Sequence, residues 1–386
     1  MKRIKKHLYL LQLEEYQSNR YSAWLKKNNI NDLKENKNQL KWTLRASLTW
    51  FFSLPLTIFT TTAKAVAWAN SLMGGVFNLI SVLVILLAKI KLSFYANTTR
   101  IVITGSYGKT TFKEMLAWVI SPYRVVLKTP DNINTPIGIA KIILTKLNRQ
   151  TEVLIVEAGA YQAGDIKKIC QLIKPQIGII TIIGLMHLER FGNFTRLKKT
   201  KQEIIPFIKE KNRLFLPPKD HHFINFKATV SKIAQNLGVS LAQIKQRLAS
   251  FVWPAHRLEE KIINHQITIL DDSYNSNPLG AQKALKKLKS FPKRQKIIIT
   301  PGMIEFSEKQ YQINFRLGRD IGCIADMAVI IGSTNKKALL DGIQANKKKI
   351  KTIILANGQD WLTVIKPHLK PPTVILLEND LPDHYF

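Results

Sequence analysis

The sequence predicts an α/β protein with a phosphate-binding parallel-sheet domain, a second α/β domain after it, and two membrane helices before it. Three observations lead to this expectation. Short apolar runs alternate with charged segments after about residue 97, two long uncharged stretches precede them, and a glycine-rich loop follows the first run. Continuous apolar strands of this kind are typical of a parallel sheet that is covered on both faces.

Eight short apolar runs are the candidate strands. They lie at residues 101–104, 153–159, 177–184, 267–270, 296–300, 327–332, 352–356 and 373–378. The segment from Trp253 to Arg257 (WPAHR) interrupts the alternation. We therefore expect one domain over residues 98–256 and a second over residues 257–386. Alternating strands and helices predict a P-loop ATPase sheet in the first domain and a Rossmann-like sheet in the second.

Charge and cysteine content narrow the possible partners. The 58 Lys and Arg against 26 Asp and Glu give a formal net charge of +32. Such an excess is typical of proteins that bind nucleic acid, anionic membrane surfaces or anionic small molecules, but here it is spread along the chain, as a compositional bias also produces. No cluster of basic and aromatic residues stands out, so we expect no nucleic-acid partner. Cys170 and Cys323 form no CxxC motif, which favours two reduced thiols.

The N-terminal quarter of the chain changes abruptly from basic to apolar. Residues 1–45 are rich in Lys and Arg, whereas residues 46–63 and 65–88 carry no charge and are separated by Lys64 alone. Each uncharged stretch is about long enough to cross a bilayer core of about 30 Å as a helix, although the first contains a proline and several threonines.

Basic residues flank both outer ends of this apolar region, so the positive-inside rule places both ends in the cytoplasm. The sequence predicts a basic cytoplasmic tail over residues 1–45 and a membrane hairpin over residues 46–97, with lipid contact through residues 46–88. The expected location is the cytoplasmic membrane, with a multi-pass anchor. The alternative is a pair of buried helices in a soluble protein.

The first apolar run ends in the loop TGSYGKTT, and a helical segment follows it through Ile120. Glycines let the backbone approach a phosphate closely, and the helix N-terminus directs N–H groups at the negative charge. Lys109 can neutralise the β- and γ-phosphates, and Thr110 can ligate Mg²⁺. Ile103 stands where the general P-loop pattern has its first glycine. The candidate ATP-binding residues of this loop are Gly105, Ser106, Tyr107, Gly108, Lys109, Thr110 and Thr111.

This loop and several later segments, taken in order, resemble the Mur ligase family over about residues 98–340. The segments are Asp131 to Gly138 (DNINTPIG), Glu157 (in VEAG), Gly184 to Glu189 (GLMHLE), Lys201 (in KTKQEI), Arg257 and Asp271 to Pro278 (DDSYNSNP). The last string resembles the MurF type, which joins D-Ala-D-Ala to a UDP-linked muramyl peptide. The resemblance implies a cytoplasmic ligase that uses ATP and Mg²⁺, forms an acyl phosphate, and acts on a muramyl-peptide precursor and a dipeptide or amino acid.

The resemblance also implies roles for particular residues. Glu157 and His187, with Thr110, would hold magnesium, and Lys201 would be a carbamylated lysine that supports a second ion. Asn134 would approach the γ-phosphate, so the catalytic candidates are Lys109, Lys201, His187 and Asn134. The second domain would complete the ATP site through Arg257 at the phosphates, Asp272 at the ribose, and Asn275 and Asn277 in the nucleotide pocket.

Three departures from the family leave the substrates open. The predicted tail and hairpin occupy the place of a sugar-nucleotide domain, the segment between Lys201 and Arg257 is short, and the last strand lacks a Lys-Gly-Ser string. The segments at 300–306 (TPGMIEF) and 378–386 (ENDLPDHYF), where the family recognises the amine, are also unusual. A lipid-linked acceptor is one hypothesis. The alternatives are a related ligase, such as a membrane-bound poly-γ-glutamate synthase, and a non-catalytic ATP-binding membrane scaffold.

Overall fold

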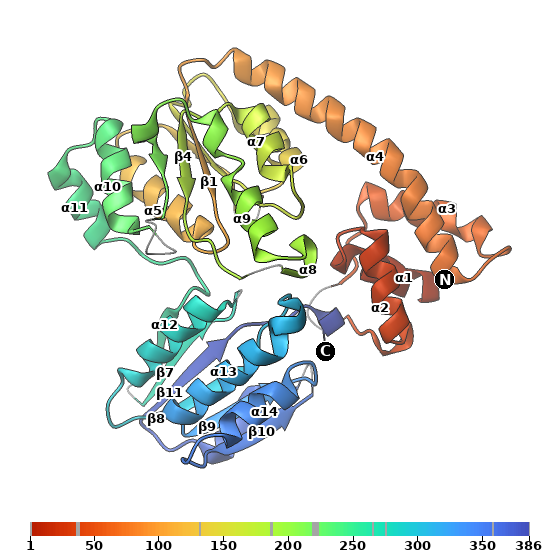
Figure 1. The fold of residues 1–386 in the computed structure, drawn as a ribbon, viewed down its shortest axis with the longest axis vertical. Helices are drawn as coiled ribbons and strands as arrows, with labels where there is room; N and C mark the ends of the chain where they lie inside the picture. The colour runs from red at the N-terminus through yellow and green to blue at the C-terminus, as the bar shows by residue number, and fades with distance from the viewer. Residues whose placement is uncertain are drawn as a thin grey trace.

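The computed structural model describes residues 2–35, 39–130, 133–185, 188–217, 224–264, 266–274, 276–356 and 359–385. A helical unit at the N-terminus, a central α/β domain and a C-terminal α/β domain follow one another along the chain (Figure 1). The long helix α4 (Thr62–Ser93) connects the helical unit to the central domain.

The central domain is built on a parallel sheet with the strand order β2-β3-β1-β4-β5. Its strands are β1 (Thr99–Thr104), β2 (Val126–Lys128), β3 (Val153–Glu157), β4 (Ile177–Ile180) and β5 (Leu214–Phe215). Its helices are α5 (Lys109–Ile120), α6 (Pro136–Lys146), α7 (Asp165–Ile173), α8 (Leu188–Phe191), α9 (Phe194–Gln202), α10 (Phe226–Asn236) and α11 (Leu241–Ala249), with the 3₁₀ turns η2 (Ile205–Phe207) and η3 (Lys211–Arg213).

Both faces of this sheet are buried, which explains the continuous apolar strands. One face packs against α6, α7 and the end of α4, and the other packs against α5 and α10. Strand β1 lies between β3 and β4, so the chain leaves it in the middle of the sheet. Ligands of open parallel sheets bind at such a switch point, beyond the carboxyl ends of the strands. The glycine-rich loop follows β1 at this position.

The C-terminal domain has the sheet order β10-β9-β8-β11-β7-β6, parallel except for the β6–β7 pair. Its strands are β6 (Glu259–Asn264), β7 (Ile267–Asp272), β8 (Gln295–Thr300), β9 (Met327–Ile331), β10 (Lys351–Leu355) and β11 (Thr373–Glu378). Its helices are α12 (Pro278–Lys289), α13 (Gln310–Ile324), α14 (Lys336–Gln344) and α15 (Trp361–Ile365), with the 3₁₀ turns η4 (Ser307–Lys309), η5 (Lys366–His368) and η6 (Asp383–Tyr385). All eight strands that the sequence predicts are present, and the three that it missed are the edge strands β2, β5 and β6.

The predicted basic tail contains folded structure in its described residues, 2–35 and 39–43. The described part folds into α1 (Lys2–Leu13), α2 (Ser18–Lys27) and the 3₁₀ turn η1 (Ile30–Asp32), around a core that includes Leu8, Leu10 and Tyr21. The sequence suggested a tail because Lys and Arg dominate its composition, but in α1 Lys2, Arg3 and Lys5 lie on the exposed side. We call residues 2–61 the N-terminal helical unit.

The two predicted membrane spans fold as α3 (Leu44–Leu56) and α4. Helix α3 has 13 residues, a rise of about 20 Å, which is short of the roughly 30 Å bilayer core. Within the described residues only α4 is long and apolar enough to cross a membrane, and 11% of its most apolar window is buried. The predicted hairpin of two crossing helices is therefore not supported.

Candidate active site

The phosphate loop is pressed against its neighbours so closely that two of its positions require glycine. Gly105 and Gly108 have φ angles of 143° and 76°, which side chains rarely adopt. A Cβ atom on Gly105 would lie 2.2 Å from Thr181 Oγ1, and one on Gly108 would lie 2.5 Å from Phe226 Cζ. The sequence pattern thus reflects both the backbone conformation and the close packing of the loop.

Hydrogen bonds fix this loop to the segment after β4. The Ser106 amide donates to the Ile182 carbonyl at 2.6 Å, and its hydroxyl donates to the Gly184 carbonyl at 3.0 Å. The Thr181 hydroxyl donates to the Tyr107 carbonyl at 2.5 Å. The loop therefore has its shape before a ligand arrives, as is usual for small-molecule sites.

Lys109, the first residue of α5, folds back over the loop. Its Nζ atom donates to the carbonyls of Gly105 at 3.0 Å and Ser106 at 3.2 Å. Burial lowers the pKa of Lys109, and nearby Arg257 lowers it further, whereas Glu157 opposes the change. A phosphate oxygen would be a stronger partner for this cation than two neutral carbonyls are.

Glu157, at the end of β3, contacts two polar side chains of α5. Its Oε2 atom accepts from the Thr110 hydroxyl at 2.9 Å and lies 3.3 Å from Lys113 Nζ. Glu157 and Lys113 are both buried. The sequence prediction missed Lys113, although its place four residues after Lys109 puts both on one face of α5. A hydroxyl and a carboxylate are hard oxygen donors of the kind that Mg²⁺ prefers, so this pair fits a magnesium ion.

Lys201 is buried in α9, with 3% of its surface exposed. Burial lowers its pKa from 10.5 to about 7, and the charge of Lys109 adds to this, whereas Asp165 and Glu203 act in the opposite direction. A large fraction of the Lys201 side chain is therefore a neutral amine near physiological pH. The sequence gave no sign of this burial, because Lys201 follows a run of exposed basic residues.

Asn134 lies beside the end of β3, where its backbone carbonyl accepts from the Gly159 amide at 2.8 Å. A Cβ atom on Gly159 would lie 2.6 Å from Asn134 Oδ1, so the glycine makes room for this side chain. Oδ1 is buried and has no hydrogen-bond partner in the described part of the chain. A buried polar atom of this kind is expected to find its partner in a ligand or a water.

The C-terminal domain contributes Arg257, Tyr274 and Asn277. The Arg257 guanidinium carbon lies 4.1 Å from the centre of the Tyr274 ring, and burial lowers the pKa of Arg257. The Asn277 side chain accepts from the Gly280 amide at 2.9 Å and so caps α12. Asp272 is half-buried at the end of β7, and its burial raises its pKa to about 6, although Arg257 opposes this.

These groups enclose a cavity of about 270 Å³, which we call the phosphate-loop pocket. The predicted residues that line it are Gly105, Ser106, Tyr107, Gly108, Lys109, Thr110, Asn134, Glu157, Lys201, Arg257 and Asn277. Thr111 and Asp272 do not line it, and Thr111 is buried. The predicted residues His187 and Asn275 lie outside the described residues. The lining residues that were not predicted are Glu15, Gly159, Ala160, Tyr161, Arg190 and Tyr274.

A second cavity, of about 510 Å³, shares Thr110 with the first. Its lining includes Trp118 of α5 and, from the segment between the two domains, Phe251, Val252 and Pro254. Aromatic and aliphatic surfaces of this kind suit the flat face of a base.

A parallel sheet with a preformed phosphate loop at its switch point, closed by a second α/β domain, defines a two-domain P-loop nucleotide-binding enzyme. The family model described as "Mur ligase middle domain" matches residues 103–297, which is half of the chain. The chain therefore belongs to the Mur ligase family of ATP-dependent ligases.

Two relatives illustrate the similarity. The UDP-N-acetylmuramoyl-tripeptide–D-alanyl-D-alanine ligase of Buchnera aphidicola subsp. Acyrthosiphon pisum is 24% identical over an alignment of 330 residues that covers 65% of this chain and 72% of the relative. The crystal structure of the MurF ligase of Thermotoga maritima with ADP has a TM-score of 0.65 at 23% identity, over 78% of this chain and 80% of that one. At this identity the structural likeness establishes the fold.

A third similar structure is that of a differently named peptide ligase. The pseudomurein peptide ligase type C of Methanothermus fervidus has a TM-score of 0.56 at 15% identity, over 73% of this chain and 76% of that one. The same fold is thus found in ligases that are named for different peptides.

Proposed function

We propose that this chain is a MurF-like ligase that uses ATP to join D-Ala-D-Ala to the carboxyl group of a muramyl-tripeptide precursor. The observation that carries the proposal is the meeting of Lys109, the Thr110–Glu157 pair and Lys201 in one pocket with Arg257 of the other domain. This set supplies cations around a triphosphate and hard oxygen donors beside it. The Buchnera relative carries this activity in its name, and the Thermotoga structure is named as a MurF ligase.

The chemistry proceeds in two transfers. A carboxylate oxygen of the acceptor attacks the γ-phosphorus of ATP, and ADP leaves, giving an acyl phosphate. The amine then attacks the acyl carbon, loses a proton, and releases inorganic phosphate. Lys109 and Arg257 would neutralise charge on the phosphoryl group as it moves, which is the main contribution a protein makes to phosphoryl transfer.

Thr110 and Glu157 would hold Mg²⁺, which supplies charge neutralisation at the phosphates. Lys201 would be carbamylated, as the resemblance implies. Only a neutral amine adds to CO₂, and the lowered pKa of Lys201 provides that form near neutral pH. His187 would join the metal ligands, and Asp272, Asn275 and Asn277 the nucleotide site, as the sequence predicts.

The second cavity would take the base of ATP. It begins at Thr110, beside the phosphate loop, and Trp118 and Phe251 offer it aromatic surface. Base–aromatic stacking contributes about 1–3 kcal/mol in nucleotide sites.

The decisive experiment measures phosphate release from ATP and Mg²⁺ with UDP-MurNAc-tripeptide and D-Ala-D-Ala, beside a Lys109→Ala variant. Release that needs both substrates and is lost in the variant would support the proposal. Release only with a lipid-linked acceptor or another amine would keep the ligase and change the substrate. A polymeric product would favour the poly-γ-glutamate synthase alternative. Bound ATP without release in any pairing would indicate a non-catalytic scaffold.

We also propose that α3 and α4 lie on an anionic membrane surface. The exposed side chains of these helices and of the turn between them include Phe51 of α3, Phe59 of the turn and Trp68 of α4, at 61%, 84% and 60% exposure. The N-terminal helical unit touches the C-terminal domain, since Tyr9 Oη donates to Asp383 Oδ2 at 2.7 Å and Trp24 Nε1 donates to the His384 carbonyl at 2.8 Å. The helical unit precedes α4 and the central domain follows it. Because the helical unit also contacts the C-terminal domain, both ends of α4 must lie on the same side of a membrane, so a position in the membrane interface fits better than a crossing.

Sedimentation with lipid vesicles tests this position. We expect the chain to bind vesicles that contain phosphatidylglycerol more strongly than neutral ones, and Phe59→Asp to weaken binding without changing phosphate release. Equal recovery in the supernatant with and without anionic vesicles would contradict it.

A further inference from the structure

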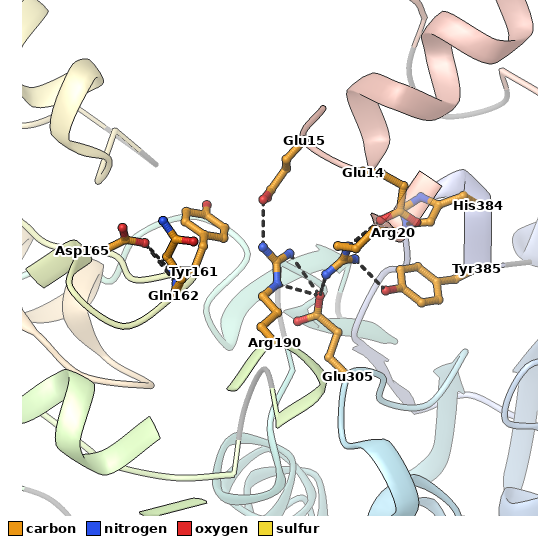
Figure 2. Close-up of polar contacts among 10 residues, drawn as sticks. All are labelled: Glu14, Glu15, Arg20, Tyr161, Gln162, Asp165, Arg190, Glu305, His384 and Tyr385. Carbon is orange, nitrogen blue, oxygen red and sulfur yellow. Dashed lines mark hydrogen bonds and ion pairs between the residues drawn. The ribbon is translucent and has the colours of Figure 1, made fainter. Parts of the chain in front are cut away.

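Arg190 joins the helical unit and both α/β domains through its side-chain contacts (Figure 2). It lies in α8 of the central domain. Its Nη1 atom donates to Glu15 Oε2 of the helical unit at 2.8 Å, and its Nη2 atom donates to Glu305 Oε1 of the C-terminal domain at 3.2 Å. Its guanidinium carbon lies 4.7 Å from the centre of the Tyr161 ring.

The two carboxylate partners of Arg190 are held differently. The Glu305 side chain is 11% exposed, accepts from both Nε and Nη2 of Arg190, and also lies 3.7 Å from Arg20 Nη1. The Glu15 side chain is 41% exposed, and its Oε2 atom accepts a hydrogen bond from Arg190 Nη1 alone among the Arg190 nitrogens. Because Glu15 is more exposed than Glu305 and accepts one hydrogen bond from Arg190 where Glu305 accepts two, a competing anion can displace Glu15 more easily than Glu305.

The location of the Glu15–Arg190 pair links it to catalysis. Glu15, Tyr161 and Arg190 line the phosphate-loop pocket and also a larger cleft of about 1190 Å³ between the helical unit and the two α/β domains. The pair therefore lies where the cleft opens toward the phosphate loop. A substrate that brings a carboxylate to the γ-phosphate from the cleft would pass this point.

The backbone fixes Glu15 in this place. Glu15 and Tyr16 have φ angles of 54° and 59°, which non-glycine residues adopt rarely and at a cost in free energy. The turn is closed by hydrogen bonds from the Tyr16 amide to the Leu11 carbonyl at 2.6 Å and from the Gln17 amide to the Glu14 carbonyl at 2.9 Å. Strained conformations of this kind concentrate at ligand sites and switches.

We propose that the Glu15 carboxylate is an internal stand-in for a substrate carboxylate, and that Arg190 binds that substrate carboxylate after displacing Glu15. The inference rests on the proposed ligase function and adds a specificity-determining residue to it. The carboxylate belongs either to the acceptor peptide or to the C-terminus of the incoming dipeptide, which offer Arg190 the same chemistry. Glu305 keeps Arg190 oriented throughout the exchange.

Steady-state kinetics of the full chain test the exchange. Glu15→Gln removes the competing charge, and we expect the KM of one substrate to fall about two- to fivefold with kcat unchanged, the effect of losing a weak exposed ion pair. Arg190→Lys keeps a cation beside Glu305 but loses the planar fork. We expect it to raise the same KM about tenfold, as loss of a charged hydrogen bond does.

Glu210→Gln is the control, because Glu210 forms an ion pair of the same length, 2.8 Å, with Arg213, and this more exposed pair lines neither cavity. It should leave both KM values unchanged. A lower KM for the tripeptide would assign the carboxylate to the acceptor, and a lower KM for D-Ala-D-Ala would assign it to the dipeptide.

A different pattern would overturn the inference. If Glu15→Gln lowers kcat or the melting temperature and lowers neither KM, then Glu15 is a structural latch between the helical unit and the central domain. If the wild-type enzyme is active and neither Glu15→Gln nor Arg190→Lys changes a KM value, the inference is refuted while the ligase function stands. A wild-type enzyme that releases no phosphate with any substrate pair would refute the ligase function, and the inference with it.

Discussion

Replacing Lys201 by methionine should stabilise the protein while it abolishes ligation. Lys201 is buried, and its pKa falls from 10.5 to about 7 on folding because burial penalises the ammonium. Methionine has a similar length and no charge, so it removes this penalty with little change in packing. The loss of activity follows from the proposed carbamate, which methionine cannot form.

The pH dependence of the gain has a defined direction. Between pH 7 and pH 10.5 the unfolded chain carries more protons than the folded one, so the stability of the wild type rises with pH over this window. Below about pH 7 the full penalty is present, at about 5 kcal/mol, and above about pH 10.5 it has disappeared. We expect Lys201→Met to gain up to about 4 kcal/mol near pH 7.5 and about 1–2 kcal/mol near pH 9.5.

Calorimetric unfolding in CO₂-free buffer with EDTA measures this gain, because both conditions keep the lysine unmodified. Lys198→Met is the control: Lys198 is exposed on the same helix, and its replacement should change the melting temperature little at either pH. A Lys201→Met variant that is less stable than the wild type, or whose gain is the same at both pH values, would refute the assignment of a neutral buried lysine.

Three other substitutions test the nucleotide site. Gly108→Ala should lower stability by at least about 2 kcal/mol, because φ is 76° and the new Cβ would meet Phe226; chemical denaturation measures this, and a neutral result would contradict the packing. Glu157→Gln should raise the Mg²⁺ concentration for half-maximal phosphate release at least about tenfold, and an unchanged Mg²⁺ titration would place the ion elsewhere. Trp118→Ala should raise the KM for ATP about tenfold through lost stacking, with Trp118→Phe close to wild type; equal effects of both would argue against a base at this site.

Local pattern was enough to find the buried strands and the phosphate loop. Buried parallel strands are apolar along their whole length, so apolar runs in the sequence reveal their positions. The edge strands β2, β5 and β6 were not predicted because they are short or partly exposed. The phosphate loop could also be recognised, since its glycines occur where the local backbone has positive φ angles. Glu157 and Asn134 became candidates through the resemblance to the Mur ligases, and both line the phosphate-loop pocket.

Contacts between distant segments could not be found in this way. Lys201 resembles its exposed neighbours in the sequence, and only the packing of α9 against the domain buries it. Tyr9 and Asp383 stand 374 positions apart, yet they meet through a hydrogen bond. Nothing in the composition of the first 45 residues distinguishes a basic tail from a folded unit with its charges outside.

The sequence by itself determined the alternating α/β elements and the phosphate loop, because these depend on periodicity and on residues adjacent along the chain. The ordered motifs indicated the class of chemistry through their resemblance to the Mur ligases. Only the tertiary structure decided that the N-terminal residues fold into a helical unit, that α3 is too short to cross a bilayer, and that Glu15 reaches Arg190. These features depend on which surfaces meet after the chain has collapsed, and burial then sets the charge state of groups such as Lys201.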